Sequence, residues 1–263
     1  MMVANSVTLG FFCTSFFWLL VRPEDLWRRQ QQAKVENSRH CPWQCITFVQ
    51  MWPGSFCIAL GKRFECVMPK DANNWTIHGL WPSNVLRCCP YRYLFPSDLV
   101  DLTPELNKHW PSFINLSNFQ FWEKEWQKHG SCAGCVEALS SPNKYFRAAL
   151  FLRTKYNIDS AFQRAAVIPS CIQSYQLSTF VTVLRPVLGD QYELQCVTDI
   201  QGRQILVQIK VSLHSNFSSS CIADSYYNTS PYKPCRSEKR VFYFPASQKY
   251  PRNPCPNSRQ VEM

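Results

Sequence analysis

Two of the five histidines in this 263-residue chain lie in segments that could carry acid–base chemistry. His78 lies in Trp75-Thr-Ile-His-Gly-Leu-Trp-Pro82, and His129 lies in Phe121-Trp-Glu-Lys-Glu-Trp-Gln-Lys-His-Gly-Ser-Cys132. Taken singly, a histidine near tryptophans is more often a packed or surface residue than a catalyst. Histidine is also the side chain that can both give and take a proton near neutral pH, so the pair together predicts an acid and a base of one reaction.

The second segment has the periodicity of an amphipathic helix. When residues are placed at about 100° intervals, Trp122 and Trp126 share one side of this helix. Four polar residues follow along the adjoining edge: Glu125, His129, Lys124 and Lys128. A helix is therefore expected over residues 121–129, anchored by its two indoles, with a carboxylate, an imidazole and two ammonium groups on one edge.

The elements that must position these residues are expected to be strands and helices in separate runs. Residues 75–78 alternate before Gly79, and residues 45–52 form a short apolar run that Pro53-Gly54 stops, so both are expected to be strands. Further helices are expected over residues 142–156, with Ser141 as N-cap, and 176–184. Further strands are expected over 204–213 and 241–244. This order favours an α+β fold over a regularly alternating one.

The two histidine segments resemble the two active-site motifs of the ribonuclease T2 family. The first matches without gaps, and the second fits the family's aromatic pair followed by His-Glu-Trp/Tyr-x-Lys-His-Gly-Thr/Ser-Cys with one exception. Weaker similarity follows in order at residues 48–53, 144–147 and 241–245. The resemblance implies a ribonuclease T2-like catalytic domain over residues 41–248, with a central antiparallel sheet, packed helices and several disulfides.

The resemblance also implies a reaction. Family members cleave single-stranded RNA by transphosphorylation to a 2′,3′-cyclic phosphate and hydrolyse that intermediate more slowly, with no metal or other cofactor. Since the 2′-hydroxyl is the nucleophile, cleavage needs one base to activate it and one acid to protonate the leaving 5′-oxygen. Carried over by position, His129 would be the base and His78 the acid, and Glu125 and Lys128 would stabilise the transition state.

Three residues are expected to bind the substrate: Gln50, Trp81 and Lys124. Trp81 would stack on the base 5′ to the cut, and the alternative is a core indole beside Pro82. Lys124 stands where the family has an additional histidine, which bears on phosphate binding and rate. Ser83 stands where an acidic residue often follows the first motif, which bears on base preference.

Cysteine usage and targeting signals point to the secretory pathway. The 14 cysteines are abundant and dispersed, as in proteins of oxidising compartments. Four N-glycosylation sequons agree with this: Asn74, Asn115, Asn216 and Asn228. The uncharged run over residues 7–21 predicts a signal peptide over residues 1–22. An uncleaved anchor is the alternative, because no basic residue precedes the run and no Ala-x-Ala site follows it.

The remaining segments are a polar linker over residues 23–40 and a basic, flexible tail over residues 249–263. Together with the targeting signals they predict a secreted or lysosomal protein, without stable membrane association unless the N-terminal run stays uncleaved. The net charge of +10 is compatible with a polyanionic partner, but on charge alone a solvated basic surface is the simpler explanation.

The family resemblance assigns only part of the cysteines. It implies bridges between Cys57 and Cys66, between Cys132 and either Cys88 or Cys89, and between Cys196 and Cys235. The usual partner of Cys221 would fall near Ser212, so that bridge is expected to be lost. Five cysteines have no assigned partner: Cys41, Cys45, Cys135, Cys171 and Cys255. If Cys13 leaves with a signal peptide, an odd number remains, which implies a free thiol or an intermolecular bridge.

Two other functions are conceivable from the sequence. His129, Cys132 and Cys135 have the spacing of zinc ligands, but no second ligand pair stands at a suitable distance in the chain, so a metal site is disfavoured. A ribonuclease fold retained as a secreted binding or signalling protein would fit Lys124 and the irregular cysteines. Against it, both histidines, Glu125 and Lys128 are present.

Overall fold

The computed structural model describes residues 41–61, 64–70, 72–222 and 232–256. The predicted signal peptide or anchor, the polar linker, the sequon at Asn228 and the end of the tail lie outside the described residues. Within the described part, no helix combines the length and the apolar character that crossing a membrane would need.

The described residues form one sheet with helices around it. The sheet has the strand order β2-β1-β5-β4-β6, and all pairs along this path are antiparallel. Two short strands extend it, because β3 pairs with β7 and β7 runs parallel to β5. The strands are β1 (Cys45–Met51), β2 (Thr76–Pro82), β3 (Ser174–Tyr175), β4 (Tyr192–Thr198), β5 (Gln204–His214), β6 (Lys233–Pro234) and β7 (Val241–Phe242).

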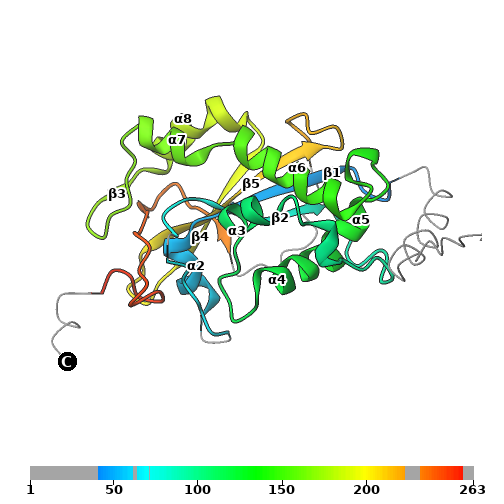
Figure 1. Cartoon of the computed structure of the whole chain (residues 1–263). Coiled ribbons are helices and arrows are strands. Elements are labelled where there is room, and N and C mark those ends of the chain that lie inside the picture. Colours follow the sequence, from blue (N-terminus) through cyan, green and yellow to red (C-terminus); the bar gives the residue numbers. More distant parts are fainter. Residues whose placement is uncertain (1–40, 62–63, 71, 223–231, 257–263) are drawn as a thin grey trace, which may run out of the picture. The chain divides into compact units, whose positions relative to one another are not determined.

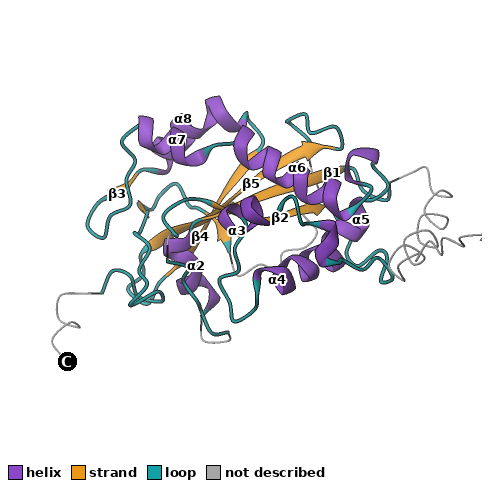
Figure 2. Cartoon of the chain, in the orientation of Figure 1, coloured by secondary structure: helices purple, strands orange, loops and turns teal. Residues whose placement is uncertain are grey.

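The helices are arranged around the sheet, as Figures 1 and 2 show. They are α2 (Pro53–Leu60), η1 (Pro96–Asp98), α3 (Thr103–His109), α4 (Asn118–Glu125), η2 (Trp126–Gly130), α5 (Ser131–Ala133), η3 (Glu137–Leu139), α6 (Pro142–Lys155), α7 (Ile158–Arg164) and α8 (Leu177–Leu188). The expected α+β class with a mainly antiparallel sheet is confirmed. The helix expected from residue 142 is also confirmed, and the side chain of its N-cap Ser141 accepts from the Lys144 backbone N–H.

The helix expected over residues 121–129 differs from the prediction in two ways. It begins earlier, at Asn118, because Ser117 and Gln120 form a capping box in which each side chain accepts from the other's backbone N–H. It also changes from α-helix to π-helix at Trp126. Single π-helical turns widen the helix and occur frequently at functional sites.

Helix α6 and the end of α3 hold strand β2 in place through buried hydrogen bonds. The Tyr145 hydroxyl donates to the Leu80 carbonyl over 2.6 Å, and Arg153 Nε donates to the Trp75 carbonyl over 3.0 Å. The Trp110 indole donates to the carbonyl of His78 over 3.2 Å. The backbone that carries His78 is therefore fixed from both sides of the histidine.

Six disulfides stabilise the domain: Cys41–Cys135, Cys45–Cys221, Cys57–Cys66, Cys88–Cys132, Cys171–Cys255 and Cys196–Cys235. Three of these are pairings that the resemblance implies, and Cys132 takes Cys88 as its partner. The family's bridge between Cys221 and the position of Ser212 is absent, as expected, and Cys221 pairs instead with Cys45 at the start of β1. Among the described cysteines, Cys89 is the free one.

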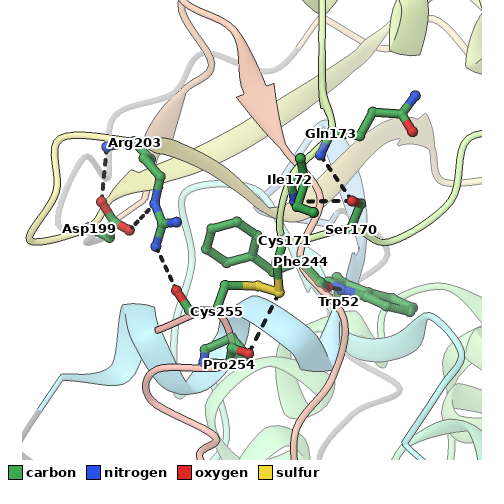
Figure 3. Close-up of a disulfide and its surroundings, with 10 residues drawn as sticks. All are labelled: Trp52, Ser170, Cys171, Ile172, Gln173, Asp199, Arg203, Phe244, Pro254 and Cys255. Atoms are coloured by element: carbon green, nitrogen blue, oxygen red, sulfur yellow. Dashed lines mark hydrogen bonds and ion pairs between the residues drawn. A yellow bond between two sulfur atoms is a disulfide. The ribbon is translucent and has the colours of Figure 1, made fainter. Parts of the chain in front are cut away.

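The bridge between Cys171 and Cys255 corrects the expectation of a flexible tail for residues 249–256. Figure 3 shows this disulfide beside the ring of Phe244, with Arg203 reaching the tail. The Arg203 guanidinium donates to the Cys255 carbonyl over 3.3 Å and pairs with Asp199 at 2.7 Å. Cys255 is buried, so this part of the tail is an ordered segment of the domain.

Candidate active site

A β-bulge aims His78 at the polar face of the sheet. Gln50 pairs with Ile77 and Val49 pairs with Gly79, so His78 is the extra residue of β2 at a register shift. Ile77 and Leu80 are both buried in the core. Bulges redirect side chains in this way, because the extra residue interrupts the alternation of the strand. His78 thus lies on the same side as Trp81, with 5.0 Å between their ring centroids.

A hydrogen bond from β5 fixes the ring of His78. Its Nδ1 lies 2.7 Å from Oε1 of Gln208, a residue that is 1% exposed. Burial lowers the pKa of His78 to about 4, and the positive charges of Lys128 and Lys210 act in the same direction. The hydrogen bond to Gln208 opposes them, because it favours the protonated ring.

The helical half of the site is held by two indoles, as the periodicity of the segment predicted. Trp122 Nε1 donates to the Trp110 carbonyl and Trp126 Nε1 donates to the Arg92 carbonyl, each over 2.7 Å. Both tryptophans are buried, so α4 and η2 are anchored along one side. His129 extends from this anchored segment near its end.

His129 is buried but lacks the directional bond that His78 has. It is 6% exposed, and its buried Nδ1 has no hydrogen-bond partner among the described residues. Burial is the main cause that lowers the pKa of His129 to about 2, and the charges of Lys128 and His78 act in the same direction. The ring instead stacks on Trp81, with 5.1 Å between centroids and 28° between planes.

Trp81 links the sheet half and the helical half of the site. Its indole stacks on His129, meets His78 edge-on, and donates from Nε1 to Oε2 of Glu125 over 2.9 Å. Gly79 makes this close approach feasible, because a Cβ at that position would lie 2.0 Å from Trp81 Nε1 and 2.7 Å from Glu125 Oε2. His78, Trp81, Glu125 and His129 therefore form one cluster.

Glu125 is an unusual carboxylic acid in this cluster. It is buried, and burial raises its pKa to about 7, while the hydrogen bond from Trp81 and the charge of Lys128 act in the opposite direction. A carboxyl group with such a pKa is largely protonated in mild acid and can then donate a hydrogen bond. Lys128 and Lys124 are both exposed on the same helical segment.

Two residues singled out in the sequence lie away from this cluster. Gln50 is 1% exposed and donates to the Tyr156 carbonyl over 2.8 Å, so its side chain faces the helix α6 end of the core. Strand β1 directs Gln50 to the opposite face from Trp81, away from the cluster in which a substrate contact was expected. The hydroxyl of Ser83 accepts from the Cys45 backbone N–H over 3.2 Å.

The structure also bears on the zinc alternative. Cys132 is joined to Cys88 and Cys135 is joined to Cys41, so neither sulfur is a thiolate that could bind metal. In the described part of the chain, no group of three potential ligand side chains could hold a metal ion.

Three residues that sequence reasoning missed lie on the polar face beside His78: Gln208, Gln195 and Lys210. Gln208 and Lys210 belong to β5, where polar residues alternate with the apolar Val207, Ile209 and Val211. That alternation was visible in the sequence, but nothing local related it to His78. The three residues become part of the site only through strand pairing.

The predicted glycosylation sites that the structure describes are accessible. Asn74, Asn115 and Asn216 are all exposed. Asn115 Nδ2 donates to Glu65 over 3.2 Å, just before the capping box of α4.

Comparison with known proteins supports the resemblance seen in the motifs. The model of the Ribonuclease T2 family matches residues 43–229. The chain is 35% identical to ribonuclease T2 of Danio rerio over 66% of this chain and 71% of that protein. It is 32% identical to ribonuclease Oy of Magallana gigas over 77% of this chain and 97% of that protein.

Solved structures show the same likeness. Human RNase T2 aligns with a TM-score of 0.63 and 30% identity, covering 77% of this chain and 99% of that one. RNase NT, solved in complex with 5′-AMP, aligns with a TM-score of 0.65 and 27% identity over 77% of this chain and 98% of that one.

Proposed function

The chain belongs to the ribonuclease T2 family, and we propose that it is a metal-independent endoribonuclease that cleaves single-stranded RNA with His78 and His129 as acid and base. The observation that carries this proposal is the cluster in which two imidazoles and the Glu125 carboxyl all contact one indole. Relatives named as ribonucleases, and a related structure that contains 5′-AMP, support an RNA substrate.

The first step is an internal transfer of the phosphodiester. Neutral His129 takes the proton of the 2′-hydroxyl, whose oxygen forms a bond to phosphorus. The bond from phosphorus to the 5′-oxygen breaks, and protonated His78 gives its proton to that oxygen. The products are a 2′,3′-cyclic phosphate and a free 5′-hydroxyl, and no metal is needed to balance the step.

The second step reverses the two roles. His78 leaves the first step neutral and takes a proton from a water molecule, whose oxygen forms a bond to phosphorus. The bond from phosphorus to the 2′-oxygen breaks, and His129, now protonated, gives its proton to that oxygen as the ring opens. The product is a 3′-phosphate. Both histidines are then back in their starting protonation states.

Charge on the phosphorane-like transition state is stabilised by the residues of the helical segment. Glu125 in its protonated form donates a hydrogen bond to a non-bridging oxygen, which its raised pKa of about 7 makes available in acid. Lys128 supplies positive charge from its exposed position beside both histidines, and Lys124 adds to the attraction of phosphate.

Trp81 binds the base 5′ to the cut after a movement. Both imidazoles contact the same indole, so a phosphate that reaches both rings must displace it. The displaced indole offers its face to a base, and stacking of this kind tolerates any base. Trp81 therefore exchanges a histidine partner for a nucleobase when RNA binds.

We place this activity in the secretory pathway, in a secreted or lysosomal glycoprotein. Six disulfides within the described domain fit an oxidising compartment. Three exposed sequons support glycosylation. One relative is named as an extracellular ribonuclease of Solanum lycopersicum, with 32% identity over 65% of this chain.

The test is cleavage of a defined single-stranded RNA in the presence of EDTA, with identification of the new ends. We expect activity to persist in the chelator and the early products to carry 2′,3′-cyclic phosphates. Loss of activity that added zinc restores would contradict the metal-free mechanism. Tight RNA binding with no cleavage would instead indicate a binding or signalling protein.

A further inference from the structure

Three side chains on one face of the sheet connect His78 on β2 to strand β4. Nδ1 of His78 lies 2.7 Å from Oε1 of Gln208 on β5. Nε2 of Gln208 donates to Oε1 of Gln195 on β4 over 2.5 Å, and Nε2 of Gln195 donates to Oε1 of Glu193 on the same strand. The register pairs Gln195 with Gln208, so both amides lie on the face that carries His78.

The donor and acceptor directions of these hydrogen bonds are fixed by the carboxylate of Glu193. An ionised carboxylate only accepts hydrogen bonds, so Gln195 must present its NH2 group to Glu193. Its carbonyl oxygen is then left to accept from Gln208, whose own carbonyl oxygen faces His78. A carbonyl cannot donate, so the imidazole must donate from Nδ1.

We propose that Glu193, Gln195 and Gln208 are positioning residues that hold the proton of neutral His78 on Nδ1 and so direct Nε2 to the RNA. This inference rests on the proposed function, because it concerns the histidine that acts there as acid. With Nδ1 committed to Gln208, only Nε2 can exchange a proton with the leaving oxygen or with water. A second partner that orients a catalytic imidazole in this way fixes its tautomer as well as its direction.

Burial alone does not account for these two glutamines. Gln204 lies on the same strand and is also buried, yet it bonds to backbone groups, donating to the carbonyls of Arg236 and Lys239. Gln208 and Gln195 are 1% and 3% exposed and bond to each other and to two titratable side chains. Buried polar groups need partners, but backbone partners would have been sufficient.

The charged and titratable groups around His78 set the direction of the expected pH effects. They are Lys210 on β5, Glu193 on β4, Glu125 on α4, Lys128 and His129 in η2, and Tyr232 before β6. Burial and the two lysines lower the pKa of His78, and the bond to Gln208 raises it. Removing that bond should therefore lower the pKa further, and a carboxylate at position 208 should raise it.

The first experiment compares Gln208→Leu with Gln204→Leu in the full-length protein, with nitrogen-15 NMR of the histidine rings at a pH where His78 is neutral. We expect wild type and Gln204→Leu to carry the His78 proton on Nδ1. Gln208→Leu should lose this preference, and its kcat should fall about tenfold, the loss expected for one buried hydrogen bond. An unchanged His78 tautomer in folded Gln208→Leu would overturn the proposal.

Two further variants keep the test decisive if Gln208→Leu does not fold. Gln208→Glu retains an acceptor, and we expect the alkaline limb of its pH–rate profile to move toward neutral by about one pH unit or more. Glu193→Gln can donate as well as accept, so it should yield a mixture of His78 tautomers. An unmoved alkaline limb in Gln208→Glu, or a pure Nδ1 tautomer in Glu193→Gln, would refute the positioning role of these residues.

The outcomes separate this inference from the proposed function. The tautomer is read from the ring nitrogens without RNA, whereas the function depends on the loss of cleavage in His78→Ala. A protein that loses cleavage in His78→Ala but keeps its tautomer in Gln208→Leu would retain the function and refute the positioning chain. Full cleavage by His78→Ala would refute the function itself.

Discussion

The two histidines of the site are held by different physical means. In the sheet half, His78 is fixed by a directional hydrogen bond to Gln208, which continues through two further side chains. In the helical half, His129 is fixed by packing on Trp81, and its buried Nδ1 has no partner among the described residues. The sheet half therefore controls where the proton sits, and the helical half controls mainly where the ring sits.

This difference follows from the backbone that carries each histidine. A strand beside other strands places neighbouring side chains side by side, so polar residues of β5 and β4 can reach His78. A helix presents its polar edge to whatever packs against it, and here that is the indole of Trp81. The two halves should consequently respond differently to mutation, pH and loss of the indole.

The largest expected effect is common to both halves. His78→Ala and His129→Ala should each lower kcat by at least about 10²-fold, because the first step needs an acid and a base together. Circular dichroism and thermal unfolding should show folded variants. Exposed His214 supplies the control, since His214→Ala should cleave at the wild-type rate.

A near-normal rate in either active-site variant would show that the reaction does not need both histidines. It would mean that one imidazole is only a structural neighbour of the other. The stacked His129, with its unpartnered Nδ1, would be the one to re-examine by substitution with glutamine.

The pH dependence of kcat/KM should report the two halves separately. His78 must be protonated to act as acid, and burial lowers its pKa to about 4, so kcat/KM should fall about tenfold per pH unit above that value. His129 must be neutral to act as base, and its pKa of about 2 keeps it neutral across this range. The optimum should lie in acid, and its alkaline limb should belong to His78.

A profile that is flat from pH 4 to 7 would contradict this assignment. Glu125 sharpens the test, because its pKa is raised to about 7 and its protonated form is the one that donates. Glu125→Gln keeps a donor at every pH and should remove any additional loss of activity near neutrality.

Loss of the shared indole should affect the helical half more than the sheet half. Trp81→Ala should weaken RNA binding by about 1–3 kcal/mol, because a base loses its stacking partner. It should also raise the pKa of His129, since burial is the main cause of its low value. The tautomer of His78 should not change, because its partner is Gln208.

Trp81→Phe is the matched control for stacking. Phenylalanine keeps an aromatic face but cannot donate to Glu125, so RNA binding should be nearer to wild type while the pKa of Glu125 rises further. Equal RNA affinity for wild type and Trp81→Ala would show that the indole has a structural role and does not stack on a base.

The smallest expected effect concerns Lys124, an exposed residue of the helical half. Lysine keeps its charge at every physiological pH, whereas histidine gains it only in mild acid. The ratio of the cleavage rate in acid to that at neutral pH should therefore be a few-fold larger for Lys124→His than for the wild type. Lys124→Ala should bind RNA a few-fold more weakly. Lys108→Ala, an exposed lysine of α3, is the control, and identical behaviour of all four proteins would show that Lys124 does not reach the phosphate.

The sequence was sufficient to predict the elements that depend only on residues close together in the chain. The period of residues 121–129 predicted buried indoles on one side, and Trp122 and Trp126 are buried. Ser141 and Pro142 predicted the start of α6, because capping is a contact between neighbours in the chain. The histidine motifs likewise identified the residues that the structure brings together around Trp81.

Features that depend on distant pairing appear only in the tertiary structure. The bulge at His78 arises from the register between β1 and β2, and the same register turns Gln50 into the core. The partner of Cys221 is Cys45, at a separation of 176 residues, which no local spacing could indicate.

The hydrogen bonds that link Glu193 to His78 show most clearly what the sequence could not predict. Each of the residues involved was visible in the sequence, but their order comes from strands β4 and β5 lying beside one another and from the bulge that turns His78 toward them. The sequence alone determined which side chains could exchange protons. Only the tertiary structure decided which ring nitrogen carries the proton, because that depends on a hydrogen bond between residues 130 positions apart.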